Sequence, residues 1–353
     1  MFHIIQRGSV TFLLAFLSFD CMAYEPYELQ PSTRAASMAG VFSPQADDSS
    51  AIWYNPAGLK RTKSISSEIS IDYAQKTTSD VIEPTATSPE IPEYGENQNG
   101  LRFAAGYIDR LPFLTKSNDR WGTGIAYFTL NQLDIYVDAP QSPINPEPFG
   151  LIEVINRQVS WMLGVTLTPN LSLGATIDVV WGDIECLEFS PCVDNDPTGM
   201  GGSLGILYDL YNSESINVKI GGTWRSQANI GYGSTPNSGI GTVLELYLPD
   251  RPESGNLGIN FQFPTSWAFI NLNLMAEKVL WSKAAGENQP LPDYTNYGIG
   301  SEWMFGLAES SSISLRAGYR QGNSNDTNEL PDFQMLTAGI GYFFYSHHSI
   351  DLG

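Results

Sequence analysis

Side chains that could carry acid–base or metal chemistry are few in this sequence. It contains three histidines, and outside the N-terminal apolar stretch they are the adjacent pair His347 and His348. A hydrolase built on a serine or aspartate nucleophile needs a positioned base, and a zinc site needs more ligands than this pair supplies. We therefore expect neither an enzyme nor a protein that holds a metal or another cofactor.

Two cysteines, Cys186 and Cys192, occur close together in the stretch Cys-Leu-Glu-Phe-Ser-Pro-Cys. Cysteines at this spacing in an exported chain indicate a disulfide that closes a loop, and an oxidising compartment permits such a bond. Zinc binding is the other chemistry open to them, and it lacks nearby partners. We expect a disulfide between Cys186 and Cys192.

The N-terminus has the features of a secretory signal peptide over residues 1–23. Arg7 provides the positive charge, Val10–Phe19 the apolar core and Cys21–Ala23 the cleavage site. A short anchor helix is one alternative, but its apolar run is too short to cross a bilayer. A lipoprotein attached through Cys21 is another, and the bulky and acidic residues before that cysteine disfavour it.

The composition excludes further classes of protein. Hydrophobic residues make up 42% of the chain and charged residues 16%, and the formal net charge is −20. This acidity repels a phosphate backbone, so we expect no nucleic-acid partner. A membrane-spanning helix needs about 20 consecutive apolar residues, and no stretch after residue 23 provides them. The low charge therefore needs another explanation.

Alternation of apolar and polar residues supplies that explanation. From Val159 to Leu167 the apolar side chains occupy every second position, and after the turn Pro169-Asn170 the same alternation resumes from Leu171 to Trp181. This pattern indicates a hairpin with one oily face and one small or polar face. Thirteen such segments follow one another, and another begins at residue 348: 66–75, 101–109, 121–137, 151–168, 171–184, 201–210, 216–226, 241–249, 256–263, 267–281, 296–306, 312–320 and 333–344.

Segment length favours a membrane protein. Several segments reach the ~9–11 residues that a tilted strand needs to cross a bilayer, whereas soluble strands commonly have ~5–6. The sequence therefore predicts an all-β fold, a transmembrane antiparallel β-barrel of about 14 strands over residues 64–353, with its apolar face toward lipid and its polar face toward the lumen. A secreted sandwich or propeller is the alternative, and the low charge disfavours it. Tryptophans at segment ends are expected to form interfacial girdles: Trp121, Trp181, Trp267 and Trp281.

Residues 24–63 lack the alternation. They contain small residues that permit close packing between Ala35 and Gly40, an Asp47-Asp48 pair able to cap a helical turn, and Asn55-Pro56, which forces a turn. An ordered segment before a barrel predicts an N-terminal hatch that plugs the lumen. A periplasmic tail is the alternative.

The same segment resembles part of a known family. Arg34–Leu59, with Ala46-Asp47-Asp48 and Asn55-Pro56-Ala57-Gly58-Leu59, resembles the hatch of the FadL/TodX family of outer-membrane transport proteins. Downstream motifs follow in the family's order and cover most of the mature chain: Ile220–Ser226, Leu248-Pro249, Gly258, the segment 267–281 with Trp281-Ser282, Leu315–Tyr319, Leu330–Asp332 and Leu336–Tyr342.

The resemblance implies a protein of the Gram-negative outer membrane that passively takes up hydrophobic compounds, such as long-chain fatty acids or aromatic hydrocarbons. In the family the hatch moves and the barrel wall opens laterally. The implied partners are a hydrophobic small molecule and outer-membrane lipid, and we expect a monomer. Asn55 and Pro56 are expected to hold a structural turn, and plain packing against the wall is the alternative for the aromatic residues. The candidate pocket-lining or hatch-anchoring residues are Phe42, Ile52, Trp53, Tyr54, Asn55, Pro56, Ala57 and Leu59.

Three departures from the family qualify this expectation. The N-terminal motifs are also similar to those of a sister group of barrels that serve in protein export, so a structural or export-accessory barrel without small-molecule cargo is the alternative. The loop 185–199 is shorter than the family's loop that helps to form an outer ligand groove. The sequence stops at Ser349–Gly353, before the family's last strand. We expect a fragment, and a barrel without its closing strand is the alternative.

Overall fold

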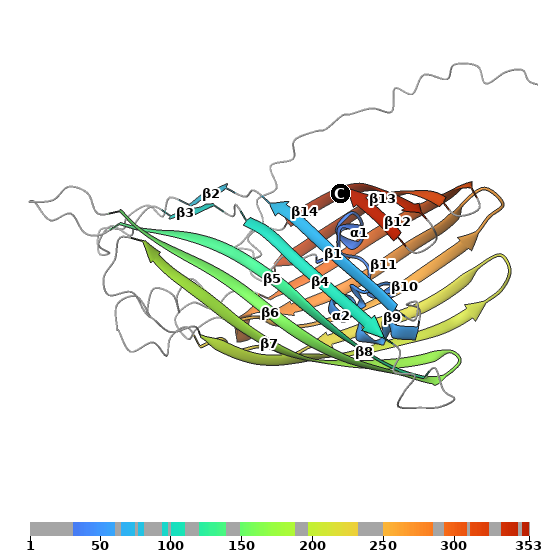
Figure 1. Cartoon of the computed structure of the whole chain (residues 1–353), viewed down its shortest axis with the longest axis horizontal. Helices are drawn as coiled ribbons and strands as arrows, with labels where there is room; N and C mark the ends of the chain where they lie inside the picture. Colours follow the sequence, from blue (N-terminus) through green and yellow to red (C-terminus); the bar gives the residue numbers. More distant parts are fainter. Residues whose placement is uncertain are drawn as a thin grey trace, which may run out of the picture.

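The computed structural model is built almost entirely from antiparallel strands (Figure 1). They are β1 (Ile65–Ala74), β2 (Thr77–Asp80), β3 (Tyr94–Asn97), β4 (Gly100–Asp109), β5 (Trp121–Asp138), β6 (Phe149–Thr168), β7 (Leu171–Leu187), β8 (Thr198–Asn212), β9 (Asn217–Arg225), β10 (Glu253–Pro264), β11 (Phe269–Leu280), β12 (Tyr294–Ala308), β13 (Ser311–Ser324), β14 (Phe333–Phe344) and β15 (His348–Leu352). Thirteen of them form one sheet in chain order, and β2 and β3 pair with each other.

Helices are short. They are α1 (Thr33–Ala36), α2 (Ala51–Tyr54) and the 3-10 helices η1 (Pro56–Lys60) and η3 (Trp281–Lys283). No helix among the described residues has the length and apolarity to cross a membrane. The structure describes residues 31–60, 65–74, 77–80, 94–97, 100–109, 120–138, 149–187, 197–231, 250–284, 293–308, 311–324, 333–344 and 348–352.

The sheet curls into a barrel. Helix α1 contacts β1 at one end of the strand order and also β14 and β15 at the other end. Figure 1 shows the strands wrapped around the two N-terminal helices. β6 has 20 residues and β7 has 17, and both are longer than a bilayer crossing requires. The predicted antiparallel barrel is therefore confirmed.

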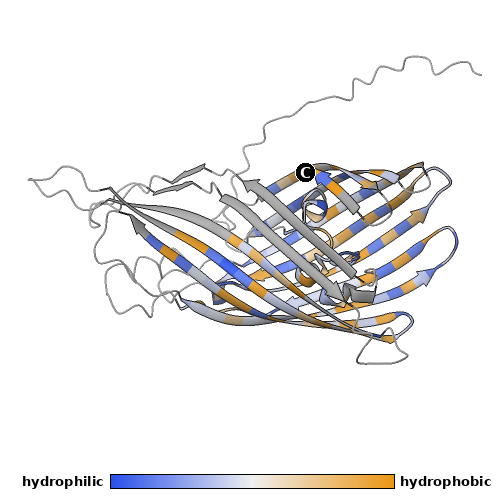
Figure 2. Ribbon diagram, in the orientation of Figure 1, coloured by the Kyte–Doolittle hydropathy of each residue, from blue (hydrophilic) through white to orange (hydrophobic). Residues whose placement is uncertain are grey.

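The two faces of the wall differ as the alternation predicts. On the hairpin of β6 and β7, Trp161 and Ile177 point outward and are each 53% exposed, whereas Ser160 and Asp178 are buried. Figure 2 shows the resulting alternation of apolar and polar bands along the strands. Outward apolar and inward polar side chains are the arrangement of a barrel surrounded by lipid.

Connection length separates the two ends of the barrel. Short turns join β6 to β7 (residues 169–170), β8 to β9 (213–216) and β10 to β11 (265–268). The opposite end carries longer connections such as 226–252 and 281–293. Outer-membrane barrels keep short turns in the periplasm and longer loops outside the cell. The short-turn end is thereby assigned to the periplasm.

Aromatic side chains collect at the short-turn end, as expected of an interfacial girdle. Trp121 and Trp267 are exposed there, and the Trp267 ring lies 6.3 Å from that of Trp303. Trp281 does not fit the expectation, because η3 turns its indole inward and buries it to 2% exposure. A strand end that bends into a 3-10 turn removes its aromatic residue from the lipid surface.

Three expectations fall on residues outside the described ranges. These are the signal peptide 1–23, the segment 241–249 and Cys192. Strands β9 and β10 pair directly with each other, from Ser254 with Arg225 to Gln262 with Asn217. Cys186 pairs with Ile152 near the end of β7, and its side chain is also outside the described set.

Candidate functional site

Residues 31–60, which we call the inner segment, lie within the barrel (Figure 1). η1 contacts β6, β7 and β8, α2 contacts β5 and β6, and α1 contacts β14 and β15. Its apolar residues are almost completely removed from solvent, including Met38, Val41 and Phe42. The backbone reverses through positive φ values at Ala39 and Gly40, which lets the segment fold back inside a narrow space.

Glycines on the inner wall make room for the inner segment. A Cβ atom at Gly174 on β7 would stand 2.2 Å from the backbone of Pro56, and one at Gly318 on β13 would stand 2.2 Å from the backbone of Met38. The segment's backbone therefore occupies the space of missing side chains on opposite parts of the wall. Similar close approaches occur at Gly205, Gly221, Gly298 and Gly339.

Asn55 joins the inner segment to β8. Its Nδ2 donates to the carbonyl oxygens of Ser43 at 3.1 Å and Ile206 at 3.0 Å, and its Oδ1 accepts from the Ala57 N–H at 3.1 Å. Pro56 follows in η1 and packs against Gly174. Leu59 also lies in η1, and its side chain is outside the described set. The side-chain amide of Asn55 is thus bonded to the inner segment before and after the turn, and also to β8 in the wall.

The candidate aromatic residues of the inner segment, Phe42, Trp53 and Tyr54, lie close to one another and to β5. The Phe42 and Tyr54 rings pack edge to face with centroids 5.6 Å apart, and the Trp53 ring lies 5.3 Å from that of Phe128 on β5. Arg225 stacks its guanidinium 3.9 Å from the Trp53 ring centre and donates to the Trp53 carbonyl at 2.6 Å. Sequence reasoning missed Arg225 as a site residue, although it belongs to the Ile220–Ser226 motif.

One side of the lumen carries an apolar cluster beside polar groups, whereas a polar inner face was expected. The buried apolar side chains of β5, β6 and β7 form one cluster with Ile52 and Trp53 of the inner segment. Polar side chains of β6 and β7 are buried on the same inner face, among them Asn156, Gln158 and Asp178. Ile184, near the long-loop end of β7, packs against the same cluster. The cluster on the wall comprises Ala126, Phe128, Leu130, Val154, Met162 and Val180, with Ala228 and Ile230 from the connection after β9.

A bulge on β5 brings three successive residues of the wall out of the alternation. The register with β6 shifts between Thr129 and Asn131. Phe128, Thr129 and Leu130 are all buried as a result. A bulge disrupts the hydrogen-bond ladder locally and bends the strand. This irregularity lies directly beside Trp53.

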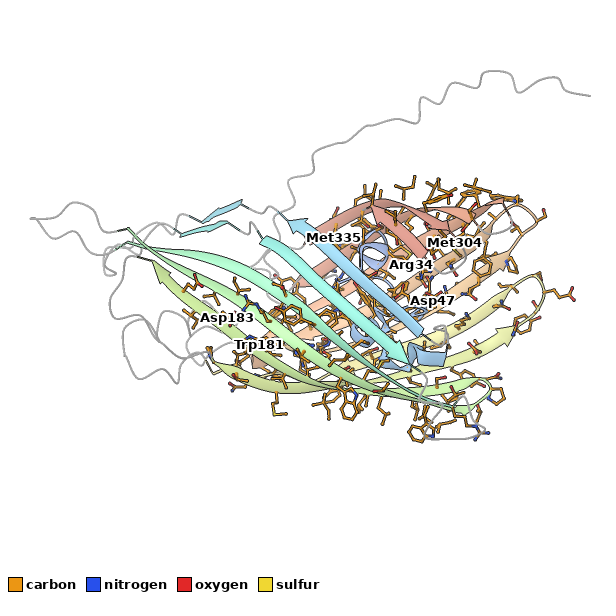
Figure 3. All side chains as sticks on the ribbon, in the orientation of Figure 1. Arg34, Asp47, Trp181, Asp183, Met304 and Met335 are labelled. Atoms are coloured by element: carbon orange, nitrogen blue, oxygen red, sulfur yellow. The ribbon has the colours of Figure 1, made fainter. Side chains whose placement is uncertain are left out.

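A network of ion pairs joins the inner segment to β12 and β13. Arg34 bonds Glu302 through Nε at 2.8 Å and Nη2 at 2.6 Å, and Arg316 bonds the same carboxylate at 2.8 Å. Arg34 also pairs with Asp47 at 2.7 Å and Asp48 at 3.0 Å (Figure 3). Bidentate guanidinium–carboxylate pairing fixes orientation as well as charge. The network was not predicted, because its members are far apart in the sequence.

Burial and the neighbouring charges shift the pKa values of Arg34 and Asp48 in opposite directions. Burial alone lowers the pKa of Arg34, but the carboxylates of Asp47, Glu302 and Asp48 raise the pKa well above its usual range. For Asp48, burial raises the pKa, and the charge of Arg34 opposes that shift. Asp48 Oδ1 accepts from the Ser50 N–H at 2.9 Å just before α2, which agrees with the capping role expected of Asp47-Asp48.

Arg251 and Asp178 form a second buried ion pair inside the barrel. Arg251 Nη1 donates to Asp178 at 2.8 Å and to Gln158 at 2.7 Å, and its Nη2 donates to the Ser226 carbonyl at 3.1 Å. Arg251 also forms a β-bridge with Ala228. These contacts fold both ends of the connection between β9 and β10 into the lumen, against the apolar cluster.

Fold and faces together define a transmembrane β-barrel of the outer membrane whose lumen holds its own N-terminal segment. Solved structures similar to it include two toluene transporters and a FadL homologue. The Pseudomonas putida toluene transporter TodX has 13% identity and a TM-score of 0.54, with 93% of this chain and 92% of TodX covered. The Ralstonia pickettii toluene transporter TbuX has 13% identity and a TM-score of 0.55, with 91% and 90% covered.

A Pseudomonas aeruginosa FadL homologue is also similar, with 14% identity, a TM-score of 0.51 and coverage of 89% of this chain and 85% of that chain. No family model matches the sequence, and no curated protein matches it. At identities this low the structural likeness establishes the fold. The predicted FadL/TodX-type fold is confirmed at that level.

Proposed function

We propose that this protein is a passive outer-membrane channel for hydrophobic compounds and that the inner segment is its hatch. The observation that carries the proposal is the apolar cluster of the lumen, which runs from Trp53 and Ile52 along β5, β6 and β7 to Ile184 near the long-loop end. A channel for polar solutes does not need apolar side chains there, whereas the transfer of an apolar solute from water onto such side chains is favourable. The fold of the similar transporters supports the same conclusion.

The proposed organisation has three parts. Residues 1–23 are a signal peptide, residues 24–63 form the hatch and residues 64–353 form the barrel. Phe42, Ile52, Trp53 and Tyr54 are the apolar contacts of the hatch with the cluster on the wall, and Asn55, Pro56, Ala57 and Leu59 anchor the hatch to the wall. The protein acts as a monomer and performs no covalent chemistry on its cargo.

The bulge on β5 is the proposed exit for cargo. Ladder hydrogen bonds are interrupted between Thr129 and Asn131, next to the contact of Trp53 with Phe128. Opening a strand pair in lipid is costly where every backbone group is bonded. A pre-existing irregularity lowers that cost. Long-chain fatty acids and aromatic hydrocarbons are the cargo classes that this path suits.

The proposal is tested by uptake into liposomes that contain the reconstituted protein, with labelled oleate and labelled toluene as probes. Phe128→Asn places an amide in the apolar path and is expected to lower the uptake rate of both probes about tenfold, equivalent to ~1.4 kcal/mol. The matched control is Ile125→Asn, because Ile125 lies on the same strand and points toward lipid. Heat-modifiable migration on gels checks that both variants are folded.

Unchanged uptake of both probes by folded Phe128→Asn would contradict the channel proposal. A structural or export-accessory barrel needs no apolar path through its lumen. Such a protein would bind neither probe, and its intact form would give the same uptake as empty liposomes.

A further inference from the structure

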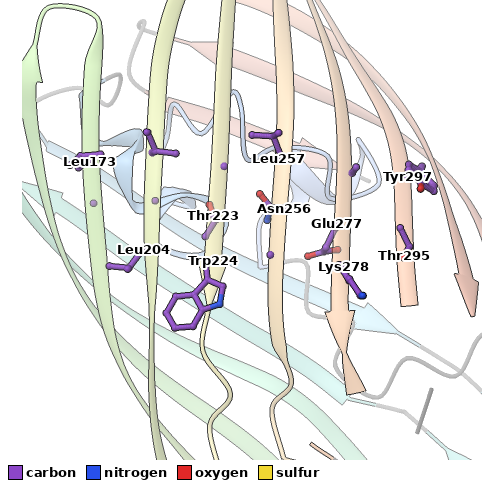
Figure 4. Close-up of a pocket in the computed structure, with 16 residues that line it drawn as sticks. Leu173, Leu204, Thr223, Trp224, Asn256, Leu257, Glu277, Lys278, Thr295 and Tyr297 are labelled. Carbon is purple, nitrogen blue, oxygen red and sulfur yellow. The ribbon is translucent and has the colours of Figure 1, made fainter. Parts of the chain in front are cut away.

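The outer wall carries a groove across β7 to β12 (Figure 4). Its volume is about 770 Å³, and its lining includes Leu204, Trp224, Gly255, Leu257, Lys278 and Tyr297. Strand register explains its shape, because Trp224 on β9 and Lys278 on β11 both stand opposite Gly255 on β10. A position without a side chain therefore lies between an indole and an ammonium group.

The groove continues into a second hollow of about 560 Å³ that shares Leu257, Ala276 and Tyr297 with it. In the first hollow the next register row also holds small residues, since Leu257 pairs with Gly222 and with Ala276. The second hollow is aliphatic, and its successive register partners are Ile220, Ile259, Leu274 and Ile299. The combined surface has a lysine at one end and mostly apolar side chains at the other, where Tyr319 and Gln321 are polar members of the second hollow's lining.

The polar end lies at the level of the outer leaflet's head groups. Trp224 is next to the last residue of β9, and Lys278 is close to the end of β11 at Leu280. Both strand ends lead into the longer connections, which face the cell exterior. The groove thus runs from that interface toward the middle of the bilayer, as the acyl chains of an outer-leaflet lipid do.

Charge at the polar end favours an anion. The Trp224 indole donates to Glu253 at 3.0 Å, and Lys283 pairs with the same carboxylate at 2.7 Å. Glu253 is thereby neutralised by a partner of its own. Within the described residues Lys278 makes no ion pair, although the chain as a whole carries a net charge of −20. An unneutralised ammonium at the interface attracts the phosphate of a lipid head group.

We propose that this groove, defined by Gly222, Trp224, Gly255, Ala276 and Lys278, is a binding site for a phosphate-bearing acyl lipid of the outer leaflet. The phosphate lies on the Lys278 ammonium over Gly255, and an acyl chain lies along Gly222 and Ala276 into the aliphatic hollow. The site is on the lipid-facing side of the wall and is independent of the cargo path in the lumen.

Native mass spectrometry of the full chain in a neutral detergent tests the site, with dioleoyl phosphatidylglycerol and dioleoylglycerol as probes. The first has a phosphate and the second has the same chains without one. We expect the phospholipid to bind at least tenfold more tightly, and Lys278→Gln to remove that preference. Lys278→Arg keeps the charge and is expected to retain it.

A second variant tests the seat itself. Gly255→Leu fills the space between the indole and the ammonium, and a Cβ there meets nothing closer than 4.0 Å, so the fold tolerates it. We expect a loss of phospholipid binding of at least tenfold. Gly306→Leu is the control, because a Cβ at Gly306 also meets nothing within 4 Å and Gly306 is outside the groove. Equal binding of the two probes, or binding that survives Gly255→Leu, would overturn the proposal.

Discussion

Glu302 is the residue on which the inner segment and the wall meet. Its carboxylate accepts hydrogen bonds from Arg34, Arg316, Gln45 and Asn271, and it is fully buried. A buried charge is tolerated when it is paired and its remaining lone pairs are bonded. Two arginines on one carboxylate satisfy that condition from both sides.

Replacing this carboxylate is expected to loosen the inner segment. Glu302→Gln keeps the shape of the side chain and removes the charge between two buried guanidinium groups, so we expect the free energy of unfolding to fall by about 3–5 kcal/mol. Urea unfolding followed by tryptophan fluorescence measures the change. Glu253→Gln is the control, because its partner Lys283 is exposed, and its expected effect is within about 1 kcal/mol. Equal effects of the two substitutions would refute the role of burial.

The Cys186–Cys192 disulfide remains a prediction of the sequence. Cys186 lies in β7, one residue before its end at Leu187, and Cys192 lies in the connection that follows. Mass spectrometry of a non-reduced digest is expected to show the two residues in one cross-linked peptide. Alkylation of both thiols without prior reduction would exclude the bond.

At the scale of elements, the close packing of the inner segment against the wall depends on wall glycines, which have no side chain. Gly174→Ala would place a methyl group against the Pro56 backbone, which cannot move aside as a flexible side chain can. Overpacking of this kind costs about 1–3 kcal/mol. We expect faster proteolysis of the inner segment in folded protein. Gly306→Ala, in open space on β12, is expected to leave the rate unchanged; similar rates for both variants would argue against the seat.

The strands could be predicted from sequence where their alternation is regular. The segments 151–168 and 171–184 correspond to β6 (Phe149–Thr168) and β7 (Leu171–Leu187). Period-2 alternation fails at the β5 bulge, where Phe128, Thr129 and Leu130 are buried together. A bulge depends on pairing with the neighbouring strand, which no single segment encodes. The apolar side of the lumen could not be predicted for that reason.

At the scale of the whole molecule, the inner segment contacts opposite parts of the wall. Deleting residues 24–63 is expected to raise single-channel conductance in planar bilayers, because the space becomes continuous from end to end. Phe128→Asn keeps the segment in place and is expected to conduct like the intact protein. Conductance that does not change on deletion would show that the segment does not plug the pore.

Contacts within the site depend on how the sheet curls around the inner segment, which the sequence alone does not specify. Arg34 and Glu302 are separated by 268 positions, and Trp53 and Arg225 by 172. The motif around Asn55 predicted a turn because local turn chemistry depends on adjacent residues, and Asn55 is bonded on both sides of that turn. The contacts of this turn with β7 and β8 depend on strand tilt and register, which alternation alone does not specify.

The glycine seats also bear on how the protein is assembled. The backbone of Pro56 lies against Gly174 on β7, and the backbone of Met38 lies against Gly318 on β13. These two strands are far apart along the chain. Bringing this segment into such close contact with both strands after the wall has formed would require the wall to open. The segment is therefore expected to be present while the strands gather, as a core around which the wall is completed. Export of the N-terminus and closure of the barrel then become parts of one folding event.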